Sequence, residues 1–239
     1  MLRRNRELGL SRYSMARTTS PARLSIWRLV FGPTVITLAV TFVRLGGELR
    51  GWPRPWFAPD RGIVGITWLP PIFGIYFALK LWHGYERTER IPRAIALGLL
   101  GLLLNEVVEV TVFPYATLSI FSELGILWAV AVVSALLQYV GWPALFETMI
   151  AYGLGARIPT VILTFFALRG HWRTHFAYGP GPQTLGFWPR FLWFGAFEEL
   201  IYWVSFTVAT GCLAGSLAAA VARRQGANPL LRSPDTVKK

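Results

Sequence analysis

Charged residues, aspartates and cysteines are scarce in this chain. Only 15% of its 239 residues are charged, whereas a soluble domain of this size carries about a quarter. The only aspartates are Asp60 and Asp235, so an aspartate-rich diphosphate-binding motif is absent. The single cysteine, Cys212, lies in an apolar run and excludes an intramolecular disulfide. This composition argues against a soluble globular domain.

The apolar residues are abundant and come in long blocks. Hydrophobic residues make up 54% of the chain and the mean hydropathy is +0.45. The blocks are about twenty residues long, enough for a helix to cross a hydrocarbon core of roughly 30 Å. The sequence predicts an all-α, polytopic transmembrane helix bundle with about six spans and short loops. The expected spans are Leu24 to Gly46, Ile63 to Trp82, Ala94 to Phe113, Ser122 to Val140, Ala144 to Leu168 and Arg190 to Ala222.

Basic residues are concentrated in the tails and in one loop. The formal net charge is +12, yet no stripe of Lys and Arg with interleaved aromatics marks a nucleic-acid surface. Fourteen Lys and Arg lie in the two tails and the 83–93 loop, against five in the loops 47–62, 114–121 and 169–189. The positive-inside rule therefore predicts both termini in the cytoplasm and a protein of the plasma membrane. The basic tails are expected to contact anionic lipid headgroups.

The chain is expected to form one transmembrane domain, residues 24–222, between two basic tails, 1–23 and 223–239. The N-terminal tail does not read as a cleaved signal peptide, because Arg28 and Pro33 interrupt the following apolar run. Met15 is a second candidate for the initiator.

Prolines and one arginine complicate two of the spans. Pro70 and Pro71 remove backbone donors and are expected to kink the second span. Arg157 and Pro159 lie inside the fifth span, which leaves two alternatives open: a kinked crossing helix or a re-entrant one. A re-entrant helix would reduce the count to five spans.

Half of the acidic residues lie in or beside apolar spans. They are Glu106, Glu109, Glu123, Glu147, Glu198 and Glu199 among twelve acidic residues in all. An ionisable group inside a bilayer costs about 2.5 to 3.5 kcal/mol on insertion scales, so it normally faces the bundle interior or a cavity. Such groups serve either to fix packing or to bind protons, ions or substrates.

Spacing predicts which of these groups meet. Glu106 and Glu109 are three residues apart and share a helix face, with Asn105 beside them. On the last span, Glu198 is expected to face the interior in one polar stripe with Tyr202, while the direction of Glu199 is left open. Arg157 is the only base near mid-depth in any span. We expect Asn105, Glu106, Glu109, Arg157, Glu198, Glu199 and Tyr202 to bind protons, cations or substrate.

The paired glutamates also invite comparison with an enzyme family. Glu198-Glu199 resembles the start of the Glu-Glu-x-x-x-Arg motif of the membrane CAAX-processing proteases. Trp203 occupies the position of the arginine, and no histidine follows His175, so the later histidine motifs of that family are missing. The chain also lacks G-x-S-x-G, H-E-x-x-H and Walker motifs.

The segment "RGHWRTHF" carries a pair of candidate metal ligands. His171 and His175 are four residues apart, so on a helix both would point the same way, as a divalent metal site requires. Solvated or lipid-facing histidines are the alternative interpretation.

Three functional classes are compatible with these observations. The first is proton- or cation-coupled transport of a small solute, with Glu106, Glu109 and Glu198 as proton or cation sites. The second is a membrane-embedded, metal-dependent enzyme that acts on a lipid or isoprenoid. The third is a non-catalytic accessory or assembly subunit, or a homo-oligomer, in which the buried charges specify packing.

Overall fold

The computed structural model is helical, and it describes residues 25–59, 63–84, 86–108, 110, 118–178 and 184–227. No strand occurs among these residues. The elements in chain order are α1 (Ile26–Leu49), α2 (Leu69–His83), α3 (Ile91–Val107), α4 (Ile120–Gly141), α5 (Pro143–Arg169), α6 (His175–Tyr178), α7 (Phe187–Phe191), the π-helix η2 (Leu192–Trp203) and α8 (Val204–Ala227). The expected N-terminal tail and residues 228–239 lie outside the described residues. The last helix continues to Ala227, past the expected domain boundary at 222.

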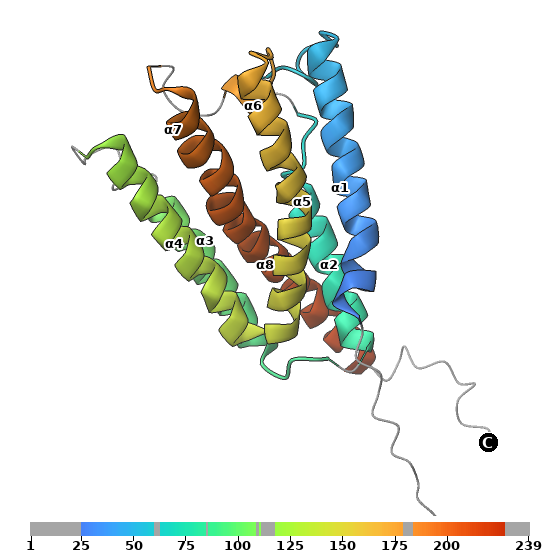
Figure 1. The fold of residues 1–239 in the computed structure, drawn as a ribbon. Helices are drawn as coiled ribbons and strands as arrows, with labels where there is room; N and C mark the ends of the chain where they lie inside the picture. Colours follow the sequence, from blue (N-terminus) through green and yellow to red (C-terminus); the bar gives the residue numbers. More distant parts are fainter. Residues whose placement is uncertain are drawn as a thin grey trace, which may run out of the picture.

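Four helices in the described part of the chain are long and apolar enough to cross a membrane. They are α1, α4, α5 and the continuous run Phe187–Gln225, which joins α7, η2 and most of α8. This confirms the prediction of a transmembrane helical protein. Figure 1 shows that α1 begins and α8 ends at the same end of the bundle, and that the segments after α1 and α5 lie at the opposite end.

The second helix is shorter than the expected span. The α2 helix has 15 residues and begins at Leu69, six residues after the expected start. Pro70 and Pro71 therefore lie in its first turn, and the expected kink is wrong. The first turn tolerates proline because its N–H groups have no partner within the helix. The α3 helix has 17 described residues.

The fifth span is one uninterrupted helix. The α5 helix has 27 residues with Pro159 inside it, which corresponds to a length of about 40 Å at the rise of an α-helix. It is one of the helices long and apolar enough to cross a membrane, as the crossing alternative requires. Arg157 thus lies in the interior of a long helix and is buried.

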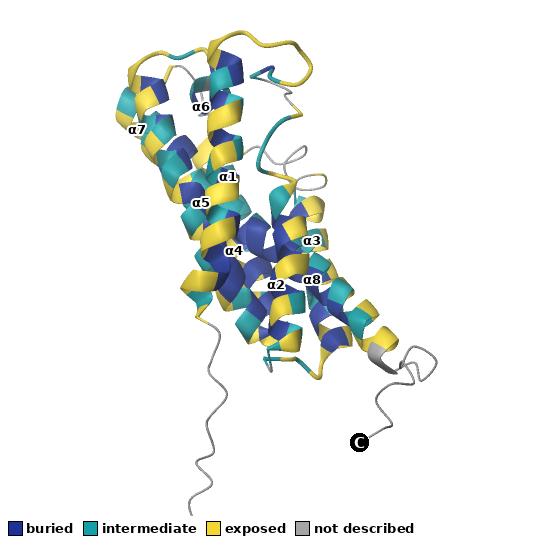
Figure 2. Ribbon diagram, turned by 90° about the vertical axis from the view of Figure 1, so that its right-hand side faces the viewer, coloured by how far each residue is buried: buried dark blue, intermediate teal, exposed yellow. Residues whose placement is uncertain are grey.

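The helix α8 occupies the centre of the bundle and contacts α2, α3, α4 and α5. A core of buried side chains, among them Phe77, Leu145 and Met149, fills the half of the bundle that contains α2. Figure 2 shows buried residues gathered on the inner faces of these helices, with exposed residues on the outer faces. Small residues bring α2 and α8 together, as in other membrane helix pairs.

Gly74 makes the closest of these approaches and gives a first testable prediction. A Cβ atom at Gly74 would meet the backbone of Gly211, with the Cα atom of Gly211 at 2.6 Å. Because both sides of this contact are backbone, Gly74→Ala must separate the helices, and we expect it to cost about 1 to 3 kcal/mol, as overpacking usually does. Gly32→Ala is the matched control, because nothing lies within 4 Å of that position. Thermal unfolding in detergent that shows equal melting temperatures for the two variants would contradict the described α2–α8 contact.

Candidate functional site

A cavity of about 650 Å³ lies between α1, α5, α6, η2 and the segment that leads from α1 to α2. We call this cavity the chamber. The chamber lies near the N-terminal end of α2. Ile66 and Thr67, which line the chamber, come just before Leu69, the first residue of that helix. Its lining residues are Thr41, Arg44, Pro59, Ile66, Thr67, Arg157, Thr160, Thr164, His175, Phe176, Phe194, Gly195, Glu198, Glu199 and Trp203.

Arg157 and Glu199 form an ion pair in the wall of the chamber. The Arg157 Nη1 atom donates to Glu199 Oε2 at 3.0 Å. The guanidinium carbon also lies 4.9 Å from the ring centroid of Trp203, within reach of a cation–π interaction. The side chain of Arg157 is only 6% exposed, and its Nε atom has no hydrogen-bond partner among the described residues. One donor of this buried cation is therefore unused.

The helix that carries both glutamates is a π-helix, which the sequence did not indicate. Residues Leu192–Trp203 adopt this conformation over twelve residues. A π-helix has more residues per turn than an α-helix, so successive side chains diverge by less than about 100°. Glu198 and Glu199 can thus both face the chamber, which answers the question that α-helical spacing left open. Among the described residues no cation forms an ion pair with Glu198.

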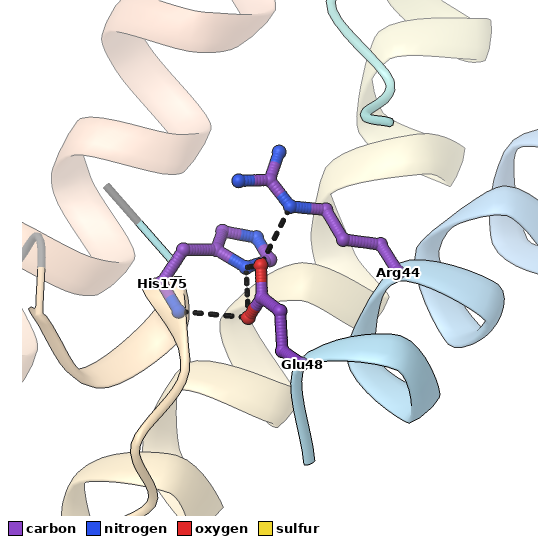
Figure 3. A network of polar contacts seen from close by, with 3 residues as sticks. All are labelled: Arg44, Glu48 and His175. Atoms are coloured by element: carbon purple, nitrogen blue, oxygen red, sulfur yellow. Dashed lines mark hydrogen bonds and ion pairs between the residues drawn. The ribbon is translucent and has the colours of Figure 1, made fainter. Parts of the chain in front are cut away.

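A second polar cluster, made of Arg44, Glu48 and His175, joins α1 to α6 beside the chamber (Figure 3). Glu48 Oε1 accepts from Arg44 Nε at 2.8 Å, and the two side chains form an ion pair. Glu48 Oε2 accepts from the backbone N–H of His175 at 2.9 Å, and His175 Nδ1 lies 2.8 Å from both carboxylate oxygens. The Glu48 side chain is fully buried behind Arg44 and His175.

The environment of His175 favours its neutral form. Burial lowers the pKa of His175, and the charges of Arg44 and Arg157 lower it further, against the opposing effect of Glu48. Because a carboxylate only accepts hydrogen bonds, Nδ1 carries the proton of the neutral ring. The Nε2 atom then has a lone pair, and Figure 3 shows it on the side of the ring away from Glu48. The chamber thus contains a proton acceptor held in one orientation.

Several residues that the sequence placed in the site do not line the chamber. Asn105 is buried between α3 and α4, where its Nδ2 atom donates to the Gly101 carbonyl at 2.9 Å and to Ser134 Oγ at 2.8 Å. Its neighbour Glu106 is exposed on the outside of α3. The expected cluster of Glu106 with Arg157 is therefore wrong, because in the described part of the chain α3 packs on α4 and α8 and has no substantial contact with α5. Glu109 lies outside the described residues.

Tyr202 also differs from expectation. It is half-buried and packs against Trp203 and Phe206, with ring centroids 5.2 and 6.3 Å away. The predicted stripe of Glu198 and Tyr202 assumed that both face the same site, and only Glu198 of the two lines the chamber. Trp203, the next residue in the chain, lines the chamber instead of Tyr202.

The two histidines of the proposed metal pair are separated by the local backbone. His171 is exposed and has a φ of 51°, outside any helix, while α6 begins only at His175. The assumption that one helix carries both side chains is wrong. Within the described ranges, no group of three or more His, Cys, Asp or Glu side chains is placed to hold a metal ion.

The sequence indicated the paired glutamates and Arg157 as candidates, but not that His175 lines the same chamber and pairs with Glu48. His175 meets Glu48 across 127 positions of the chain, and only the pairing of Arg44 with Glu48 had a local signal. Comparisons of the chain with protein-family models, with curated proteins and with solved structures find no match.

Proposed function

We propose that this protein is a proton-coupled transporter of a small solute and that the chamber is its binding site. The observation that carries the proposal is the meeting of Glu198, Glu199 and Arg157 in one cavity of about 650 Å³. Cavities of roughly 300 to 1,000 Å³ are the usual size of small-molecule sites. Ionisable groups at membrane depth typically mark substrate or proton pathways.

We place the chain in the plasma membrane with six crossings and both tails in the cytoplasm. The helices α2 and α3, with 15 and 17 residues, run for about 22 and 26 Å at the rise of an α-helix. They count as two further crossings beside the four longer helices. The excess of Lys and Arg in the tails and the 83–93 loop supports this orientation, with those tails against anionic lipid. The chamber then lies in the outer half of the membrane.

In this proposal Glu198 carries the coupled proton. Glu199 is balanced by Arg157, whereas no described cation pairs with Glu198, and an uncompensated charge is costly in a desolvated site. Taking up a proton removes that cost. The packed core around Phe77, Met149 and Tyr152 closes the chamber toward the cytoplasm, so release on that side requires the helices to rearrange.

The test is solute-driven proton movement in proteoliposomes that contain a pH-sensitive dye. Gradients of small organic acids, amines and neutral solutes are imposed in turn on the wild type, Glu198→Gln and Glu147→Gln. We expect at least one solute to move protons with the wild type, and Glu198→Gln to abolish that movement. Glu147 is exposed and does not line the chamber, so its variant serves as the control. Coupled proton movement that persists in Glu198→Gln would exclude the mechanism.

A second candidate function, a membrane-embedded enzyme, is favoured by the neutral His175 held by Glu48. An imidazole oriented by a buried carboxylate is a common general base. The same chamber would then bind a substrate and convert it. Product analysis separates the two proposals, because a transporter returns its solute unchanged. A subunit of a larger complex would instead show neither flux nor turnover and would copurify with partner proteins.

A further inference from the structure

The fixed charges around the chamber cancel in pairs, except for one. Arg157 is paired with Glu199 at 3.0 Å, and Arg44 is paired with Glu48 at 2.8 Å. Burial and two nearby arginines lower the pKa of His175, which favours its neutral form. Glu198 is the remaining titratable group, so the chamber holds one negative charge when Glu198 is ionised and none when it is protonated.

Both arginines nevertheless have N–H donors with no acceptor among the described residues. Arg44 meets Glu48 through Nε, and Figure 3 shows its two terminal nitrogens pointing away from that carboxylate. No hydrogen bond joins those nitrogens to a described residue. Arg157 uses Nη1 for Glu199, while its Nε is buried without a partner. Because Arg157 Nε has almost no accessible surface, a ligand in the chamber would instead meet the terminal nitrogens of Arg44 and the small exposed part of the Arg157 side chain. Charge-assisted hydrogen bonds from these cations favour an anionic acceptor.

The rest of the wall is apolar and aromatic. Ile66, Phe176, Phe194 and Trp203 line the same cavity as the two arginines. An inorganic anion would leave these surfaces in contact with water, whereas an organic body would cover them. The chamber is therefore suited to a ligand with a charged end and an apolar end.

We propose that the solute is an organic carboxylate with an apolar body, held by Arg44 and Arg157, and that it enters with one proton on Glu198. Two negative charges in a desolvated chamber would repel each other, so the anion binds well only when Glu198 is neutral. Anion and proton then bind together with no net change in charge. This inference rests on the proposed transport function and names its substrate class.

The inference is tested by equilibrium binding to the full-length protein in nanodiscs. The probes are benzoate, octanoate and 2-naphthoate, each compared with its uncharged amide, and inorganic phosphate as an anion without an apolar body. Calorimetry between pH 5.5 and 8 in two buffers of different ionisation enthalpy gives the affinity and the number of protons taken up. We expect a carboxylate to bind, its amide and phosphate to bind at least tenfold more weakly, and one proton to be taken up per ligand. Above the pH at which Glu198 ionises, the affinity should fall about tenfold per pH unit, as linkage to one proton requires.

Three variants assign the effect to residues. Arg44→Gln should weaken carboxylate binding at least tenfold, whereas Arg50→Gln, an exposed arginine six residues on that does not line the chamber, should leave it unchanged. Glu198→Gln should bind the carboxylate with an affinity that no longer depends on pH. Because Arg44→Gln also disturbs Glu48, its melting temperature is recorded, and the pH dependence of the wild type is the independent test.

The outcomes separate this inference from the transport proposal. Amides that bind as well as carboxylates, binding that releases protons, or no binding by any carboxylate would overturn the inference even if another solute drives proton flux. Carboxylate binding with proton uptake, but without flux in proteoliposomes, would support the substrate class and remove transport.

Discussion

Replacing Arg157 by methionine is expected to lower the free energy of unfolding by about 3 to 5 kcal/mol, the usual cost of leaving one member of a buried ion pair without its partner. Arg157 is 5% exposed as a residue, and its partner Glu199 sits 3.0 Å away. Methionine has a similar length and no charge, so the variant removes the ion pair and the cation–π contact with Trp203. Unfolding by SDS titration in mixed micelles measures the loss.

The double variant Arg157→Met/Glu199→Gln makes this result specific. If the single losses arise from an uncompensated charge, removing both charges should cost much less than the sum of the two single changes. Arg93→Met is the control for loss of a positive charge, because Arg93 is exposed at the start of α3. Losses that simply add in the double variant would show that Arg157 and Glu199 do not depend on each other.

The transmembrane class was predictable because it depends on residue composition over long segments. The apolar blocks gave the approximate position of every described long helix. The two adjacent glutamates in the last span indicated that this span contributes to a polar site. Glu199 and Arg157 were both selected as candidates because charge in an apolar helix is costly wherever the helix packs. These inferences needed no knowledge of which helices are neighbours.

The arrangement of the site was not predictable, because it depends on helix packing and on local backbone geometry. Glu106 and Asn105 are, like Glu198, polar residues inside an apolar span. However, α3 lies beside α4 and α8, away from Arg157. No local pattern revealed the π-helix of residues 192–203, which brings Glu198 and Glu199 to one face. The start of α2 was misplaced because proline was interpreted as a kink within a helix, when here it marks the first turn.

The second large effect is expected at Glu48. The variant Glu48→Ala should lower the free energy of unfolding by about 3 to 5 kcal/mol, because it leaves the Arg44 guanidinium without its counter-charge in a partly buried site. It also leaves the backbone N–H and the Nδ1–H of His175 without an acceptor. Glu147→Ala is the matched control, since Glu147 is exposed on α5 and belongs to no ion pair among the described residues.

Glu48→Gln distinguishes charge from shape at the same position. The amide oxygen still accepts one hydrogen bond, but the amide nitrogen must face a donor from Arg44 or His175, so we expect an intermediate loss of about 1 to 3 kcal/mol. Hydrogen exchange of the His175 amide gives a local readout, because that N–H donates directly to Glu48. Faster exchange at His175 in Glu48→Gln, with α8 still protected, would show that Glu48 fixes α6 at the chamber wall. If Glu48→Ala and Glu147→Ala were equally stable, Arg44 and His175 would hold their positions without Glu48. Glu48 would then not be the residue that orients these two side chains at the chamber.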